Sequence, residues 1–244
     1  MNTTAWRLPD APLRASAVTS NVIGLFAVFA LASVARASLP LGDRYPLKAS
    51  ALFAAVMWLS FGFLQQHHPF GRFGPANQIT TVRAMLVALV AGLVGEPRLP
   101  GIAAGAVAAS AAVTVLDGVD GWVARRARIA SAFGARFDME IDGLLILTLS
   151  VLAWRYEKAG AWVVVSGLLR YVFVAVGAIA HWLRAALPPS RRRQTICVIQ
   201  IAGLTLAMMP AILPPLSTVL AAVAFVTLTY SFLLDTLWLW RHAA

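Results

Sequence analysis

The sequence predicts an all-α integral membrane protein, and three observations support this fold class. Hydrophobic residues make up 60% of the 244 residues, and the mean hydropathy is +0.77. This composition is too apolar for an ordinary soluble domain. Apolar runs of about 20 residues, the length that a helix needs to cross a bilayer, recur along the chain. Most charged residues lie between these runs or at their ends.

Eight apolar runs meet this length requirement. They cover residues 17–36, 47–65, 77–95, 101–122, 136–156, 160–184, 194–213 and 216–240. The first run follows a short polar leader, residues 1–16. A cleaved signal peptide is the alternative, but the run is longer than a usual signal sequence and other spans follow it. We therefore expect an uncleaved first helix.

The charge distribution predicts the orientation in the membrane. The formal net charge of +10 could attract nucleic acid or anionic lipid. If the N-terminus is inside, twelve basic residues fall on the inner segments and six on the outer ones. This bias follows the positive-inside rule and argues against nucleic acid as a partner. We expect a protein of the bacterial cytoplasmic membrane whose acidic site faces the cytoplasm.

Five of the ten acidic residues lie in residues 117–142, DGVDGWVARRARIASAFGARFDMEID. In the first half of this stretch, one helical face carries residues spaced i, i+3, i+4, i+7 and i+8. These residues are Asp117, Asp120, Gly121, Ala124 and Arg125. The spacing predicts a helix that presents two carboxylates, a bare backbone patch and a guanidinium on one side.

A second helix is expected to begin near Ser131, and it too carries an acidic face. Gly134, Asp138 and Asp142 repeat at i, i+4 and i+8. If the two faces meet, four carboxylates repel one another unless a hard cation neutralises them. The pattern therefore predicts one or two Mg²⁺ or Mn²⁺ ions, with Arg125 placed to pair with a phosphate.

The motif DxxDGxxARx8GxxxDxxxD, complete over residues 117–142, resembles the signature of the CDP-alcohol phosphatidyltransferases. The resemblance implies a six-helix catalytic membrane domain, residues 71–244. Residues 17–70 would be two additional N-terminal transmembrane helices. The family also implies a homodimer among membrane lipids, with a CDP-linked lipid as donor and a small alcohol as acceptor.

The resemblance assigns roles to the residues of the motif. It implies two metal ions held by Asp117, Asp120, Asp138 and Asp142. It places the CDP moiety on Asp117, Gly121, Ala124, Arg125 and Gly134. Asp142 would also be the catalytic residue, the general base that deprotonates the alcohol.

Upstream, the segment NxxTxxR at residues 77–83 resembles the opening of the first core helix in this family. The resemblance implies that Thr80 and Arg83 face the nucleotide. An arginine inside a membrane helix needs an anionic partner, which agrees with this view. Asn77 is also a candidate N-cap of the helix.

Arginines near the later spans are candidates to bind the acceptor. Arg170 lies inside an apolar run, where a charge is costly unless it is functional. The run Arg191, Arg192 and Arg193, followed by Gln-Thr, loosely resembles the KxKT of phosphatidylglycerophosphate synthases. A topology signal is the alternative for this run. Both features favour a phosphorylated alcohol, with glycerol 3-phosphate as the first choice.

The predicted activity is phosphatidyl transfer from CDP-diacylglycerol to an alcohol, with release of CMP, for phospholipid synthesis. Inositol phosphate, serine, or diacylglycerol with a soluble CDP-alcohol are alternative substrates. A non-catalytic transporter is the alternative of another class.

Three further features complete the expectations. Small residues at 101–113 predict a helix packed on several sides. Cys197 is expected to fill space, and Asp235 has no obvious partner.

Overall fold

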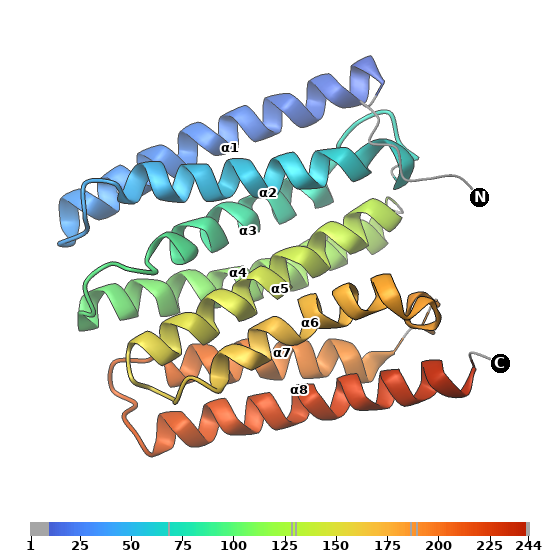
Figure 1. The fold of residues 1–244 in the computed structure, drawn as a ribbon. Coiled ribbons are helices and arrows are strands. Elements are labelled where there is room, and N and C mark those ends of the chain that lie inside the picture. Colours follow the sequence, from blue (N-terminus) through green and yellow to red (C-terminus); the bar gives the residue numbers. More distant parts are fainter. Residues whose placement is uncertain are drawn as a thin grey trace. The chain divides into compact units, whose positions relative to one another are not determined.

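The computed structural model describes residues 10–67, 69–127, 129, 131–185, 187–188 and 190–242. These residues form eight α-helices and one 3₁₀-helix, without a strand (Figure 1). The helices are α1 (Ala11–Ser38), α2 (Tyr45–His67), α3 (Pro75–Gly92), α4 (Pro100–Arg126), α5 (Ala132–Arg155), α6 (Val163–Ile179), η1 (His181–Arg184), α7 (Arg191–Ala207) and α8 (Leu216–Arg241). The all-α prediction is confirmed. Residues 1–9 of the expected leader lie outside the described residues.

Each of the eight apolar runs corresponds to a helix, and three boundaries differ by five residues or more. α1 begins at Ala11 rather than at residue 17, with a proline in its first turn, where the missing N–H costs nothing. α6 ends at Ile179 rather than at residue 184, and Arg184 of η1 donates from Nε to the carbonyl of Gly177, in the last turn of α6, at 2.6 Å. α7 ends at Ala207, before Pro210, since a proline disfavours helix in the residue that precedes it.

Three of the described helices are long and apolar enough to span a bilayer: α1, α4 and α8. α6 is also apolar but shorter. For the remaining described helices, crossing of the membrane stays a prediction. Even so, α1, α4 and α8 give the chain the character of a multi-pass membrane protein.

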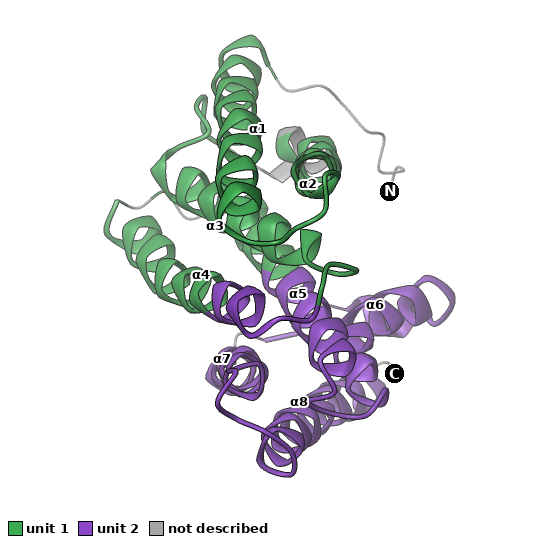
Figure 2. Cartoon of the chain, turned by 90° about the vertical axis from the view of Figure 1, so that its left-hand side faces the viewer, with its two compact units in different colours: residues 1–97, 108–141 green, residues 98–107, 142–244 purple. Residues whose placement is uncertain are grey.

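The chain forms two compact units (Figure 2), residues 1–97 with 108–141, and residues 98–107 with 142–244. In the first unit, α1, α2 and α3 pack against one another. Gly24 of α1 allows this, since a Cβ there would lie 2.7 Å from the Phe53 ring of α2 and 3.6 Å from Met85 Sδ of α3. These contacts fix α3, whose polar residues contribute to the site.

In the second unit, α7 packs on α8 and α6 packs on α8. A Cβ on Gly203 would lie 3.0 Å from Ala224 Cβ, so the backbones of α7 and α8 approach closely. Between α5 and α6 the approach is closer still, because a Cβ on Gly167 would lie 2.5 Å from Leu147 Cα. The Ser150 and Ser166 hydroxyls bond each other at 3.0 Å across this same contact.

The expectation that residues 101–113 are packed on several sides is wrong for the single chain. Ala104, Gly105 and Ala108 of α4 are exposed, whereas Ile102 and Ala106 are buried. One strip of α4 therefore presents small side chains and bare backbone outward. Such a strip permits close approach by another helix.

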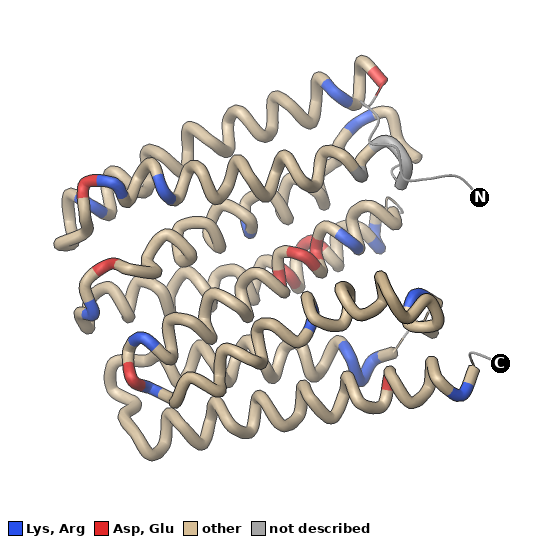
Figure 3. The backbone as a smooth tube through the Cα atoms, viewed as in Figure 1, with Lys and Arg blue, Asp and Glu red and all other residues tan. Residues whose placement is uncertain are grey.

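Acidic residues pair with basic ones at the predicted outer ends of the helices. Arg36 pairs with Asp43, Lys48 with Glu96 at 3.6 Å, and Arg98 with Glu157 at 2.7 Å. Most other acidic positions gather on α4 and α5 (Figure 3). Three of the six basic residues on the predicted outer side therefore have an acidic partner.

Lys158 joins the α5–α6 connection to the α7–α8 connection. Its ammonium donates to the carbonyl oxygens of Met209 at 3.0 Å and Ile212 at 2.6 Å. Its own carbonyl accepts hydrogen bonds from the hydroxyls of Ser217 at 2.7 Å and Thr218 at 3.0 Å. Burial lowers the pKa of this lysine, because the charged form loses its hydration.

Replacement of Lys158 by methionine is expected to lower the free energy of unfolding by about 1–3 kcal/mol, since buried carbonyl oxygens lose their donor. Thermal unfolding in detergent measures the effect. Arg44→Met, which removes an exposed cation on the same predicted side, is the control. Equal melting temperatures for the two variants would contradict a role for Lys158 in joining the connections.

Candidate metal and nucleotide site

The end of α4 and the start of α5 bring three carboxylates together in the first unit. One oxygen each of Asp117, Asp120 and Asp138 lie within 4.8 Å of one another. The Asp120 side chain is 7% exposed, while those of Asp117 and Asp138 are 34% and 37% exposed. The meeting of the two acidic faces, expected from spacing alone, is confirmed for these three residues.

Ser131 explains why the second helix begins where the sequence predicts. Its hydroxyl oxygen accepts a hydrogen bond from the Gly134 amide at 3.0 Å, which is the N-cap interaction of α5. The cap fixes the register of α5. Asp138 therefore lies one turn after Gly134 and faces the acidic end of α4.

Arg83 supplies the countercharge of the carboxylate cluster. Its side chain is fully buried, and Nη1 lies 2.9 Å from Asp117 Oδ1 and 2.8 Å from Asp120 Oδ2. The same nitrogen pairs with Asp138 Oδ1. A single cationic nitrogen thus contacts all three carboxylates.

Thr80 adds a fourth polar group from α3. Its hydroxyl donates to Asp120 Oδ2 at 2.9 Å. The sequence predicts that Thr80 and Arg83 face the nucleotide, but in the structure both contact carboxylates. Their role in nucleotide binding stays a prediction.

The donor set fits a hard divalent cation. Mg²⁺ and Mn²⁺ prefer carboxylate oxygens, and two ligand oxygens on opposite sides of Mg²⁺ lie about 4 Å apart. The carboxylate oxygens of Asp117, Asp120 and Asp138, which lie at most 4.8 Å apart, have a comparable separation. Because Arg83 Nη1 contacts all three carboxylates, their oxygens converge on a point where positive charge is stabilised. Asp117, Asp120 and Asp138 are therefore the residues that would hold an ion.

Arg125 and Gly121 lie on one face of α4, as their spacing predicts. A Cβ on Gly121 would lie 3.1 Å from Arg125 Nη1, so the guanidinium lies over the bare backbone of Gly121. Arg125 is exposed, and Ala124 beside it is half-buried. This arrangement leaves a cation at the surface, one turn beyond the acidic cluster, where a phosphate can reach it.

A pocket of about 150 Å³ opens at the start of α3. It is lined by Phe70, Arg72, Phe73, Gly74, Ala76, Asn77 and Ile129. The motif residue Gly134 borders this lining, since a Cβ there would lie 3.0 Å from Asn77 Oδ1. Aromatic, basic and amide groups in a small pocket suit a nucleobase.

Asn77 does not cap α3, so this expectation is wrong. Gly74 is the N-cap residue, at φ 79°, a conformation that glycine adopts without strain. Pro75 takes the first helical position, which its fixed φ favours. Asn77 lies inside the first turn, and its Nδ2 donates to the Phe73 carbonyl at 2.5 Å.

Asp142 lies one turn after Asp138 on α5 and belongs to the second unit. It is half-buried, and its Oδ2 accepts a weak hydrogen bond from Cys197 Sγ of α7 at 3.6 Å. The contact was not foreseen, because an isolated cysteine gives no functional signal. Cys197 does more than fill space.

Arg170 lies beside the same stretch of α5. A Cβ on Gly143 would lie 2.7 Å from Arg170 Cδ and 3.1 Å from Nε. The arginine side chain therefore crosses the bare backbone of the residue that follows Asp142. The second unit thus combines a half-buried carboxylate and a half-buried guanidinium.

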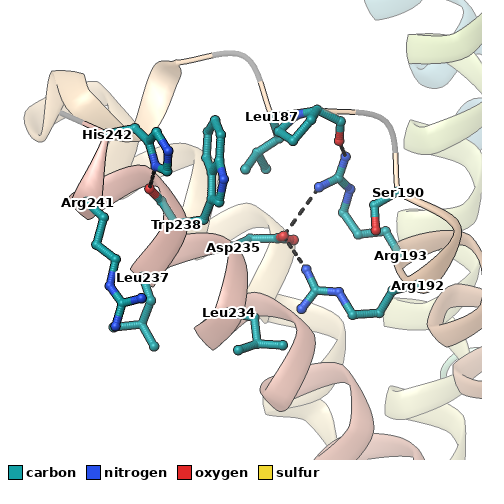
Figure 4. Close-up of a pocket in the computed structure, with 11 residues that line it drawn as sticks. Leu187, Ser190, Arg192, Arg193, Leu234, Asp235, Leu237, Trp238, Arg241 and His242 are labelled. Atoms are coloured by element: carbon teal, nitrogen blue, oxygen red, sulfur yellow. Dashed lines mark hydrogen bonds and ion pairs between the residues drawn. The ribbon is translucent and has the colours of Figure 1, made fainter.

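A larger pocket of about 530 Å³ lies between the start of α7 and the end of α8 (Figure 4). Asp235 pairs there with Arg192 Nη2, and with Arg193 Nη1 at 3.3 Å. The expectation that Asp235 lacks a partner is therefore wrong. Sequence spacing could not reveal the pair, because 42 and 43 residues separate the partners.

The three candidate acceptor arginines of this run are not equivalent. Arg192 and Arg193 line the pocket together with Arg241 and His242 (Figure 4), whereas Arg191 is exposed and does not line it. Nη1 of Arg192 is buried and makes no hydrogen bond within the described part of the chain. Arg192 therefore retains a donor for an anionic group.

Comparison with known protein families gives a match. A sequence profile of the CDP-alcohol phosphatidyltransferases matches residues 73–237, about two-thirds of the chain. No curated protein and no solved structure matches significantly. The matched segment contains the whole aspartate motif and its partners on α3, and it leaves out α1 and α2. The chain therefore belongs to the CDP-alcohol phosphatidyltransferase family, membrane enzymes of phospholipid synthesis that transfer a phosphatidyl group from a CDP-alcohol.

Proposed function

We propose that this enzyme transfers the phosphatidyl group of CDP-diacylglycerol to glycerol 3-phosphate and releases CMP. The observation that carries the proposal is the convergence of Asp117, Asp120 and Asp138 on one cationic nitrogen. Such a cluster suits divalent metal and the diphosphate that accompanies it. A transporter has no evident use for this arrangement.

The CDP moiety of the donor would bind at the same end of the first unit. The small pocket beside Asn77 would take the base, with Gly134 leaving room for it. Arg125 is exposed near the acidic cluster, which supports a contact with the diphosphate. Gly121 has no side chain and Ala124 has only a methyl group, so a ligand could approach this face of α4 closely.

Asp117, Asp120 and Asp138 would hold Mg²⁺ or Mn²⁺, and Asp142 extends this set along α5. Bound metal would draw electron density from the attacked phosphorus and neutralise the leaving CMP. Arg83 would hold the carboxylates in place, since its guanidinium already contacts three of them.

Asp142 would act as the general base. The hydroxyl oxygen of the acceptor forms a bond to the β-phosphorus, and its proton passes to the Asp142 carboxylate. The bond from that phosphorus to the bridging oxygen breaks, and CMP leaves with the electron pair. The half-buried position of Asp142 supports this role, because its carboxylate remains accessible to a bound alcohol.

The acceptor would be a phosphorylated alcohol. Arg170 crosses the backbone beside Asp142, so it supplies a cation close to the proposed base. The pocket of Arg192, Arg193 and Arg241 adds positive charge, which Asp235 only partly neutralises. A cation close to the proposed base favours a phosphorylated alcohol such as glycerol 3-phosphate over an uncharged one.

The distribution of basic residues and the exposed surface of α4 support a location and an oligomeric state for this enzyme. The inward bias of arginine supports a cytoplasmic site in a bacterial inner membrane, where CDP-lipid and glycerol 3-phosphate meet. The exposed strip of small residues on α4 supports a homodimer within the lipid bilayer.

CMP release by detergent-purified protein tests the proposal. The assay supplies CDP-diacylglycerol with Mg²⁺ or Mn²⁺ and one alcohol at a time: glycerol 3-phosphate, inositol phosphate or serine. A further reaction pairs CDP-choline with diacylglycerol. Release with glycerol 3-phosphate alone is expected. Release with another acceptor would replace the substrate, and no release by folded protein would favour the transporter.

Asp142→Asn is expected to lower kcat by about 10²–10⁴, because the amide cannot accept the proton. CDP affinity in the presence of metal should change much less. Glu140→Gln, which removes a charge two residues away on the same helix, is the control. Turnover near the wild-type rate in Asp142→Asn would exclude the assignment of the base.

Gly134→Ala should weaken CDP binding, since the new methyl group would meet Asn77 Oδ1 at 3.0 Å. A crowded contact of this kind costs roughly 1–3 kcal/mol. Gly118→Ala is the matched control, because nothing lies within 4 Å of a Cβ at that position. Titration calorimetry with CDP and Mn²⁺ measures both variants, and equal affinities would count against the pocket.

Arg170→Met is expected to raise the KM for glycerol 3-phosphate by at least tenfold while the KM for CDP-diacylglycerol stays unchanged. A charged hydrogen bond is worth about 1.5–3 kcal/mol, which corresponds to this change. Asp235→Asn would also change the KM for glycerol 3-phosphate, because it would release Arg192 and Arg193. An equal rise in both KM values would show that Arg170 does not select the acceptor.

A further inference from the structure

We propose that the two additional helices, α1 and α2, hold the wall of the nucleotide pocket, and that Ser16 is the positioning residue. This inference rests on the proposed function. The family match begins at residue 73, so α1 and α2 lie outside the segment that family members share. Their contacts nevertheless converge on α3 and on the residues just before it.

At one end of the extension formed by α1 and α2, α2 and the loop before it form hydrogen bonds with the end of α3 and the residues that follow it. Tyr45 Oη donates to the Leu89 carbonyl at 3.0 Å, and Lys48 Nζ donates to the Val94 carbonyl. The Gly42 amide donates to Glu96 Oε2 at 2.7 Å. Side chains and backbone of the extension thus hold α3 firmly at this end.

At the other end, α1 reaches the pocket. Ser16 Oγ accepts a hydrogen bond from the Phe73 amide at 2.9 Å and donates to the Leu13 carbonyl at 3.1 Å. The Phe73 carbonyl accepts from Asn77 Nδ2. The backbone of Phe73 is therefore held on its N–H side by α1 and on its C=O side by α3.

The anchored residue lies in the lining of the small pocket. Phe73, Gly74 and Asn77 all line it. The Phe73 ring is 4% exposed and contacts the Phe133 ring of α5, with 6.1 Å between centroids. Movement of Phe73 would move Asn77, which lies against the motif residue Gly134. Ser16 therefore acts on the nucleotide through Phe73 and Asn77, without touching it.

The experiment compares the full-length wild type with Ser16→Ala. We expect the Kd for CDP and the KM for CDP-diacylglycerol to rise roughly three- to tenfold, the effect of one lost hydrogen bond. The kcat and the Mn²⁺ affinity should stay unchanged, and the melting temperature should fall by no more than about 2–4 °C. Ser16→Thr keeps the hydroxyl and should restore nucleotide affinity.

Ser20→Ala is the matched control. Ser20 lies one turn further along α1, and its hydroxyl donates to the Ser16 carbonyl at 3.0 Å within the helix. Wild-type affinity in this variant would support the specific role of Ser16. An equal loss in both serine variants would overturn it, because α1 as a whole would then be responsible.

Two other results would also overturn the inference, and they differ in meaning. If the wild type binds CDP and Ser16→Ala binds it equally well, the inference alone fails. If the wild type binds no CDP, the proposed function fails together with it. Faster hydrogen exchange at the Phe73 amide in Ser16→Ala would confirm that the anchor itself has been lost.

Discussion

The structure depends on one partly buried ion cluster, in which Arg83 faces three carboxylates. Like charges about 4–5 Å apart repel by about 3–4 kcal/mol per pair at an effective dielectric constant of 20. A guanidinium that is fully buried is equally costly without partners. Each side of the cluster therefore requires the other. The cluster joins α3, α4 and α5, and it explains how an apolar membrane protein keeps the charges of Arg83 and Asp120 buried.

The need to bring Arg83 and the carboxylates together explains the positions of other elements in the first unit. Arg83 and Thr80 must lie at the right position along α3 to reach the carboxylates, and Gly74 and Pro75 determine where this helix begins. The Ser131 cap sets the register of α5 in the same way and brings Asp138 to the cluster. The second unit contributes different chemistry, a half-buried carboxylate at Asp142 and the guanidinium of Arg170. Under the proposed function, the groups of the first unit would hold the donor, and those of the second would activate and bind the acceptor.

Much of this could be predicted from the sequence, because helices and motif faces depend on local periodicity. The eight apolar runs became helices, and the spacing of Asp117, Asp120 and Asp138 was enough to expect one cluster. Contacts between residues far apart in the chain could not be foreseen. The pairing of Asp235 with Arg192, and the contact of Cys197 with Asp142, depend on helix packing and leave no local pattern. The exposed strip on α4 was missed for a related reason, since small residues permit close packing without specifying the partner.

The most direct test of the account is Mn²⁺ binding by the purified protein, followed by electron paramagnetic resonance with and without CDP. The account predicts that Mn²⁺ binds and that CDP tightens its binding, because the diphosphate adds oxygen ligands. It also predicts that Asp120→Asn abolishes both effects, since Asp120 is the most buried carboxylate of the cluster. Mn²⁺ binding that is absent, or that survives unchanged in Asp120→Asn, would contradict the account.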